Sequence, residues 1–221
     1  MSKIAFVLVA GVAASAASAQ QTILTFGFTE LNGSYSVGSG IFSAVGVDQG
    51  VGSPLRTSGD VSRLQGPNGT AVYSPGTGNN RVNVALAVSG ILGTTANGAG
   101  TIQVLDVNGD ILSATVQGQF IANGPAVFFN GLLTNASFTS VSGDNSFDGP
   151  SGGSFPLTFA PALPPYTGAI IQLYVGSPGN FFSGNFTGVS TQVSGAIVPG
   201  PASLAAMGLG LAAFGGRRRR R

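Results

Sequence analysis

Residues Gly100 to Ile121 read GTIQVLDVNGDILSATVQGQFI and show the clearest structural pattern in the chain. From Leu112 to Phe120, apolar residues or glycine alternate with Ser, Thr and Gln, which predicts a β-strand with one buried and one wet face. In the first half of the stretch, before the turn, Ile102 and Val104 are the apolar residues expected on the same buried face. The stretch therefore predicts an antiparallel hairpin.

The turn in this hairpin sets the register of the two strands. A two-residue Asn-Gly loop would pair Val104 with Ser113 and so place an apolar side chain opposite a polar one. A three-residue loop pairs Val104 with Leu112 instead, which keeps both apolar faces on one side. We therefore expect the three-residue loop.

The acidic residues of this turn have a spacing found in calcium-binding loops. In the expected loop, Asp106 takes the first position of a type I turn and Gly109 the left-handed position. Asp106 and Asp110 then face each other as like charges. Asp106, Asn108 and Asp110 have the one-three-five spacing of a Ca²⁺ loop, although Gln117 stands where a bidentate Glu is required. We expect either a calcium site or ordinary turn chemistry here, and no other cofactor.

The rest of the chain from residue 22 to residue 198 consists of short runs typical of strands, with glycine-rich turns between them. Ala126–Asn130 and Leu132–Val141 are expected to form a second hairpin, and Gly90–Gly100 a connection. We therefore expect an all-β domain over residues 20–197, a single antiparallel β-sandwich or flattened β-barrel that hides its strand edges. Six Asn-Gly pairs, each a strong turn signal, begin at Asn32, Asn68, Asn97, Asn108, Asn123 and Asn130.

Missing residue types limit the chemistry that the chain can perform. It has no histidine and no cysteine, which excludes Ser-His-Asp and Cys-His catalysis, disulfides and the usual zinc ligands. Glycosidase chemistry would need two carboxyls facing each other across a cleft, whereas most of the acids here lie in turn-like segments. We expect a non-enzymatic protein without catalytic residues. The alternative is a secreted carbohydrate-active or other hydrolytic enzyme.

The N-terminus has the three parts of a secretory signal peptide. Lys3 supplies the positive charge, and Ile4–Ala14 forms an apolar segment of the usual ~7 to 15 residues. Ala17 and Ala19 provide the small residues of a cleavage site before Gln20. We expect residues 1–19 to be removed, so that the mature chain begins at Gln20.

Residues 198–221 form a second targeting segment. Val198, Pro199, Gly200 and Pro201 interrupt the chain, because proline fixes φ and lacks an amide donor. Residues 202–216 are apolar or glycine except for one serine, and a helix over them would be about 22 Å long, shorter than the ~30 Å hydrocarbon core of a membrane. The segment ends in five arginines, Arg217, Arg218, Arg219, Arg220 and Arg221. By the positive-inside rule, this cationic end is expected to stay on the cytoplasmic side of the membrane.

A proline motif (198–202), a short apolar helix and an arginine cluster, in this order, resemble the PEP-CTERM sorting signal of Gram-negative bacteria. The usual motif of that family is Val-Pro-Glu-Pro, and here Gly200 replaces the Glu. The resemblance implies processing by exosortase, a membrane protease-transferase, and association with exopolysaccharide in a biofilm matrix. An ordinary tail anchor is the alternative interpretation.

The charge distribution separates the targeting segments from the domain between them. Lys3 and the terminal arginines account for the net charge of +2, because residues 20–216 hold three arginines and seven acids, a charge of −4. This argues against nucleic acid as a partner. The polar residues of the domain are mostly Ser, Thr, Asn and Gln, which suit contacts with polysaccharide. We expect the protein to be exported, to pause in the inner membrane, to be cut near 198–201 and to reach the cell surface or the medium.

Overall fold

The computed structural model describes residues 24–47, 63–66, 68–74, 77, 80–157, 170–176 and 180–197, and these contain strands but no helix. The predicted all-β fold is therefore confirmed for this part of the chain. The strands are β1 (Leu24–Ser36), β2 (Ile41–Val45), β3 (Arg63–Gly66), β4 (Gly69–Val72), β5 (Val82–Leu92), β6 (Thr95–Leu105), β7 (Ile111–Asn123), β8 (Ala126–Thr139), β9 (Ser146–Asp148), β10 (Ser154–Pro156), β11 (Ile170–Val175) and β12 (Phe186–Ile197).

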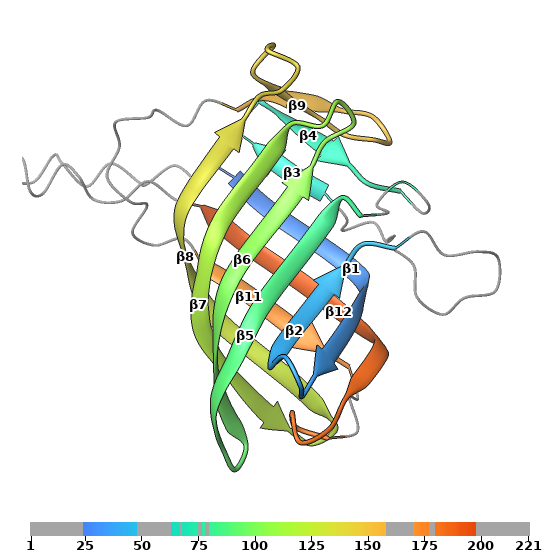
Figure 1. Cartoon of the computed structure of the whole chain (residues 1–221). Coiled ribbons are helices and arrows are strands. Elements are labelled where there is room, and N and C mark those ends of the chain that lie inside the picture. Colours follow the sequence, from blue (N-terminus) through green and yellow to red (C-terminus); the bar gives the residue numbers. More distant parts are fainter. Residues whose placement is uncertain are drawn as a thin grey trace, which may run out of the picture.

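Eight of these strands form a closed antiparallel barrel, in the order β1-β2-β5-β6-β7-β8-β11-β12 and back to β1 (Figure 1). Of the two predicted architectures, the structure has the barrel. Strand β1 is long enough to serve two neighbours: residues 32–36 pair with β2, and residues 25–27 pair with β3. Strands β3 and β4 thus extend beyond the barrel, and β9 and β10 form a separate two-stranded sheet at one end.

The barrel closes because the first and last strands pair along most of their length. The β1–β12 ladder runs from the pair Leu24 and Ile197 to the pair Tyr35 and Phe186. Its register shifts beyond Phe28, where β1 holds an extra residue and Glu30 adopts a φ of 57°. Such a bulge bends a strand locally, as closing a barrel requires.

The hairpin that the sequence analysis singled out has the expected register. Val104 pairs with Leu112, and Ile102 pairs with Ala114. Gly109 adopts a φ of 88°, the left-handed conformation expected for it. Both strands bury the apolar residues of this alternation inside the barrel, namely Ile102, Val104, Leu112, Ala114, Val116 and Phe120.

Aromatic side chains fill much of the barrel interior. The ring of Phe120 lies 4.7 Å from that of Phe129 and 5.5 Å from that of Phe42, measured between centroids. Phe182 contacts the same group, with its ring 4.8 Å from that of Phe120. All four side chains are buried, as an eight-stranded barrel with a side-chain-filled interior requires.

A row of inward-facing glycines makes room for these rings. Gly98, Gly118 and Gly131 are direct neighbours on β6, β7 and β8. A Cβ atom on Gly98 would lie 2.6 Å from Phe120, and one on Gly131 would lie 2.6 Å from Phe129. Real Cβ contacts do not come this close, so any side chain here would displace the aromatic core.

This row explains why three of the six predicted Asn-Gly turns are wrong. Asn97-Gly98 lies inside β6, Asn130-Gly131 inside β8, and Asn32-Gly33 inside β1. Gly33 meets a similar constraint, because its Cβ would lie 2.2 Å from Oγ1 of Thr191. Packing inside the barrel therefore overrides the local turn signal. The other three pairs lie at the β3–β4, β6–β7 and β7–β8 turns, as expected.

Two further expectations are wrong because stretches predicted as a turn or a connection lie mostly within strands. The predicted hairpin at Ala126–Asn130 and Leu132–Val141 is the single strand β8. The predicted connection Gly90–Gly100 is mostly strand, because β5 and β6 continue to a tight turn at residues 93–94. Within these strands, Gly98, Gly100 and Gly131 lie too close to neighbouring atoms to carry a side chain. Gly93, with a φ of 58°, lies in the turn itself.

The predicted targeting segments lie outside the described residues. These are the signal peptide with Ala17, Ala19 and Gln20 at its cleavage site, and the sorting segment from Val198 to Arg221. In the part of the chain that the structure describes, no helix could span a membrane.

Candidate functional site

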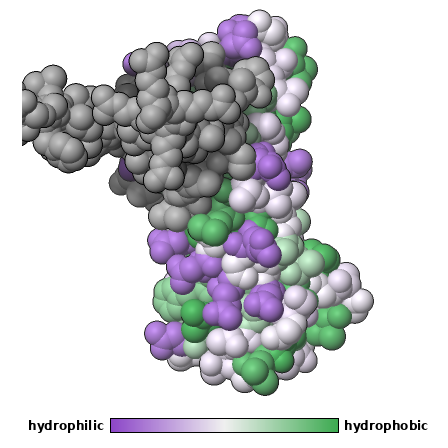
Figure 2. Space-filling model, turned by 90° about the vertical axis from the view of Figure 1, so that its left-hand side faces the viewer, coloured by the Kyte–Doolittle hydropathy of each residue, from purple (hydrophilic) through white to green (hydrophobic). Residues whose placement is uncertain are grey.

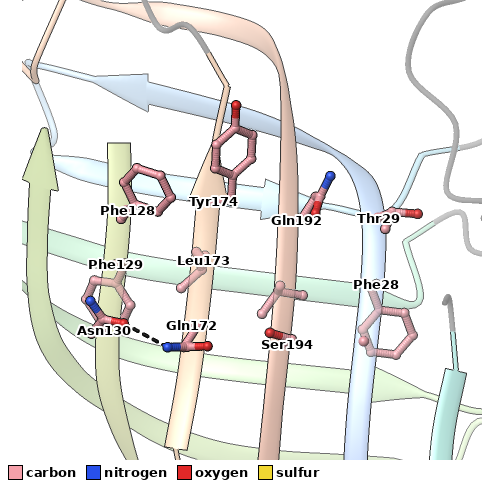
Figure 3. Close-up of a pocket in the computed structure, with 12 residues that line it drawn as sticks. Phe28, Thr29, Phe128, Phe129, Asn130, Gln172, Leu173, Tyr174, Gln192 and Ser194 are labelled. Atoms are coloured by element: carbon pink, nitrogen blue, oxygen red, sulfur yellow. Dashed lines mark hydrogen bonds between the residues drawn. The ribbon is translucent and has the colours of Figure 1, made fainter. Parts of the chain in front are cut away.

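A groove of about 510 Å³ crosses the outer surface of the barrel over β8, β11, β12 and β1 (Figure 3). Phe129, Leu173, Val193 and Phe28 are neighbours in register along its floor. Their side chains are buried in the core. The outward side chains on either side of this line form two walls, so the groove runs across the strands.

The first wall is partly aromatic. Phe128 on β8 pairs with Tyr174 on β11, which pairs with Gln192 on β12. The rings of Phe128 and Tyr174 meet edge to face, with centroids 5.4 Å apart. These side chains are 38% and 40% exposed. Thr29 on β1 continues this wall (Figure 3).

The second wall consists of amide and hydroxyl groups. Asn130 on β8 pairs with Gln172 on β11, and Gln172 pairs with Ser194 on β12. Nε2 of Gln172 donates a hydrogen bond of 3.0 Å to Oδ1 of Asn130 (Figure 3). Gly27 ends the wall on β1. Because glycine has no side chain, the wall is lowest there.

Strand alternation places these residues on one face. Phe128 and Asn130 are two positions apart, as are Gln172 and Tyr174, and residues two apart in a strand point to the same side. The sequence analysis did not identify this site. The alternation is visible in residues 170–175, IIQLYV, but its meaning depends on the pairing of β11 with β8, some 40 residues away.

The groove has an uncharged lining. None of the residues that line it within the described part of the chain is acidic or basic. The nearest charges along the chain and the sheet lie at the β1 end, where Glu30 follows Thr29 and Arg63 pairs with Gly27. Figure 2 shows polar and apolar side chains interspersed over the lower part of the face that it presents. The lining thus offers hydrogen-bonding and aromatic groups without a net charge.

The predicted calcium site is a hydrogen-bonded junction at one end of the barrel. Asp106 is fully buried, and its Oδ1 accepts bonds from the backbone N–H groups of Asn108 (2.7 Å) and Asp110 (2.8 Å). Its Oδ2 accepts a bond of 3.1 Å from the backbone N–H of Asp148 in β9. Nδ2 of Asn108 donates to Oδ2 of Asp148 at 2.8 Å. These bonds attach β9 to the β6–β7 turn.

Asp110 attaches a second segment to the same turn. It has no exposed surface, and its oxygens accept bonds from the backbone N–H groups of Val141 and Ser142 and from the hydroxyl of Ser142. Burial raises the pKa of Asp110, but the bonds from Ser142, Val141 and Ser140 outweigh it, so the pKa lies below its usual value. Asp110 is therefore a carboxylate at neutral pH.

The carboxylates of Asp106 and Asp110 thus accept hydrogen bonds from different amide groups and share none of these donors. The backbones of Asp106 and Asp110 are paired across the turn, with the N–H of Asp106 donating to the O of Asp110 at 3.0 Å. Within the described residues, no three His, Cys, Asp or Glu side chains are grouped to hold a metal ion. Calcium at Asp106, Asn108 and Asp110 and ordinary turn chemistry both stay predictions.

A buried tyrosine adjoins this junction. The hydroxyl of Tyr73 donates a bond of 2.9 Å to the backbone O of Leu105. Burial raises the pKa of Tyr73 well above its usual value, the negative charge of Asp106 raises it further, and Arg81 acts in the opposite direction. Tyr73 therefore stays protonated at neutral pH and acts as a hydrogen-bond donor inside the fold.

Comparison with known proteins adds no further evidence. No family model matches the chain, and no curated protein or solved structure is significantly similar to it.

Proposed function

We propose that this chain is an exported, non-enzymatic protein of the cell surface or extracellular matrix that binds exopolysaccharide in the groove over β8, β11, β12 and β1. The observation that supports this function best is the composition of the two walls. One wall presents the exposed pair Phe128 and Tyr174, and the other presents Asn130 and Gln172. The groove combines a contact surface for apolar faces with groups that bond hydroxyls.

Sugars match both walls. The C–H faces of a pyranose ring pack on aromatic side chains, which offer large contact areas at surfaces. Its hydroxyls both donate and accept hydrogen bonds, and so do the amide groups of Asn130, Gln172 and Gln192.

The groove lining supports binding over hydrolysis. A glycosidase that uses two carboxyl groups needs them on either side of the scissile bond. The described residues that line the groove include no carboxyl group. Asp106 and Asp110 lie in the turn junction and bond to the backbone and Ser142. A secreted carbohydrate-active enzyme thus has less support than a binding protein.

Binding to extracellular polysaccharide tests this proposal directly. Tyr174→Ala should weaken retention of the protein on its cognate exopolysaccharide, because it removes half of the aromatic pair. Val37→Ala is the matched control, since Val37 is 50% exposed in the turn between β1 and β2, outside the groove lining. Equal retention of both variants and the unmodified protein would contradict the proposed site.

The termini supply the export route in this proposal. The signal peptide would be removed before Gln20, and the membrane stop at Arg217–Arg221 would hold the chain transiently in the inner membrane. An exosortase-like enzyme would then cut near Val198–Pro201 and release the barrel. Mass spectrometry of surface and medium fractions should find no peptide containing Leu204–Phe214. Such a peptide in the mature protein would leave an ordinary tail anchor.

A further inference from the structure

The two walls of the groove are parts of longer rows that run across the barrel. The amide wall continues from Asn130 to Gln119 on β7 and Asn97 on β6, each directly paired with the next. The aromatic wall continues from Phe128 to Ile121 on β7. All of these outward side chains are exposed. With their ends on β1, the two rows thus follow the curved outer surface of the closed barrel from β6 through β12 to β1.

Resting on the proposed function, we infer that the ligand is an uncharged linear polysaccharide, which lies across the strands and is bound along the middle of its chain. Neighbouring strands are about 4.8 Å apart, so the row from β6 to β12, which follows half of the circuit of the eight-stranded barrel, measures roughly 19 Å along the curved surface. Asn97, Gln119, Asn130, Gln172 and Ser194 present one polar side chain on each strand over this distance. A repeating polymer can use such a repeating row, whereas a single sugar would use only one part of it.

The part of the amide row from Asn97 to Ser194 is uncharged, and a charged side chain, Arg63, is reached only where β3 pairs with Gly27 at the β1 end. This part of the row favours a neutral polymer. Anionic polysaccharides and nucleic acids are bound chiefly through Arg and Lys. No such side chain lies in the amide row between Asn97 and Ser194 or in the groove lining of the described residues. Amides instead present both donors and acceptors, which suits hydroxyl groups.

The closure of the barrel disfavours an extended peptide as the occupant. Peptides that bind to sheets commonly add a strand to an open edge through main-chain hydrogen bonds. Strands β8, β11, β12 and β1 are each paired on both sides. A ligand over the groove can therefore contact side chains but cannot extend the sheet.

Substitutions outside the groove but within the row test this inference. Gln119→Ala in the full exported protein should lower the affinity for long neutral polymers roughly fivefold, the effect of about one lost hydrogen bond. It should leave binding of short oligosaccharides that fill only the groove unchanged. Gln103→Ala is the matched control, because Gln103 is an exposed amide of β6 outside the row. Thermal melting confirms that each variant folds.

Isothermal titration with a linear β-glucan, a β-mannan, a xylan and alginate, each as polymer and short oligosaccharide, separates the outcomes. Tighter binding of at least one neutral polymer than of alginate, weakened by Gln119→Ala, supports the inference. Equal or tighter binding of alginate, binding of an extended peptide instead, or loss with Tyr174→Ala but not with Gln119→Ala overturns it. Failure to bind any polysaccharide, native exopolysaccharide included, overturns the proposed function itself.

Discussion

Replacing Gly98 by alanine tests whether the inward glycine row exists for the aromatic core. The added Cβ would lie 2.6 Å from Cε2 of Phe120 and 2.8 Å from Cε2 of Phe129. Both rings are buried and already in contact, with centroids 4.7 Å apart. They cannot move without displacing other core residues, so the substitution should destabilise the barrel.

The size of this effect follows from the packing. Added methyl groups in a well-packed core typically cost about 1–3 kcal/mol. For a domain of this size, 1 kcal/mol changes the melting temperature by roughly 2–4 °C. A cost of about 2 kcal/mol, the middle of the energy range, corresponds to a loss of about 4–8 °C. We expect Gly98→Ala to lower the melting temperature by this amount. Differential scanning calorimetry and urea unfolding both measure it.

A second substitution identifies the cause of the loss. The nearest atoms to the Cβ of Gly98 are all side-chain atoms of phenylalanine, so Phe120→Leu should remove the closest contact and make Gly98→Ala less damaging in that background. Gly118 is the contrasting case, because its Cβ would meet the backbone O of Asn130 at 2.2 Å. Phe120→Leu should not rescue Gly118→Ala. If Gly98→Ala melts like the unmodified protein, the packing explanation for the buried Asn-Gly pairs is wrong.

The turn junction and Tyr73 give three further predictions. The pKa of Asp110 is lowered on folding, so its contribution to stability is present above pH ~4 and disappears as the pH falls through the folded pKa. Asp110→Asn should therefore lower the melting temperature at pH 7 and make the melting temperature less dependent on pH in acid. The pKa of Tyr73 is raised on folding, so stability should fall above pH ~10 as the unfolded tyrosine ionises. Tyr73→Phe should flatten this alkaline decline and cost about 1 kcal/mol through the lost bond to Leu105. Millimolar Ca²⁺ should leave the melting temperature unchanged, since the carboxylate oxygens of Asp106 and Asp110 already accept hydrogen bonds; a rise that Asp110→Asn abolishes would instead establish the calcium site.

The β6–β7 hairpin was predictable because all of its determinants are local. The apolar alternation fixed which residues share a face, and the requirement that Val104 oppose Leu112 fixed the loop length. The turn residues Asp106 and Gly109 then took positions that suit their chemistry. Neighbouring residues and steric rules were sufficient, without knowledge of the remaining strands.

The groove was not predictable in this way because its walls come from distant parts of the chain. Tyr174 belongs to the short strand β11, which is far in sequence from β8. Its ring meets that of Phe128 because β11 pairs with β8 in the barrel. The junction had the same limitation. The sequence brought Asp106 and Asp110 together, and two of the amide groups that bond to Asp106 belong to the turn itself. The other amide groups come from residues 141, 142 and 148.

The misassigned pairs Asn97-Gly98 and Asn130-Gly131 connect the core to the candidate binding surface. In each pair the glycine points inward and makes room for an aromatic ring, while the asparagine points outward into the amide row. Successive residues of a strand face opposite sides, so each dipeptide meets a packing requirement and supplies an outward amide at once. A turn at either site would interrupt the strand and take its asparagine out of the amide row. The same two residues that signal a chain reversal elsewhere thus position an outward amide here, and the aromatic core fixes where that amide lies.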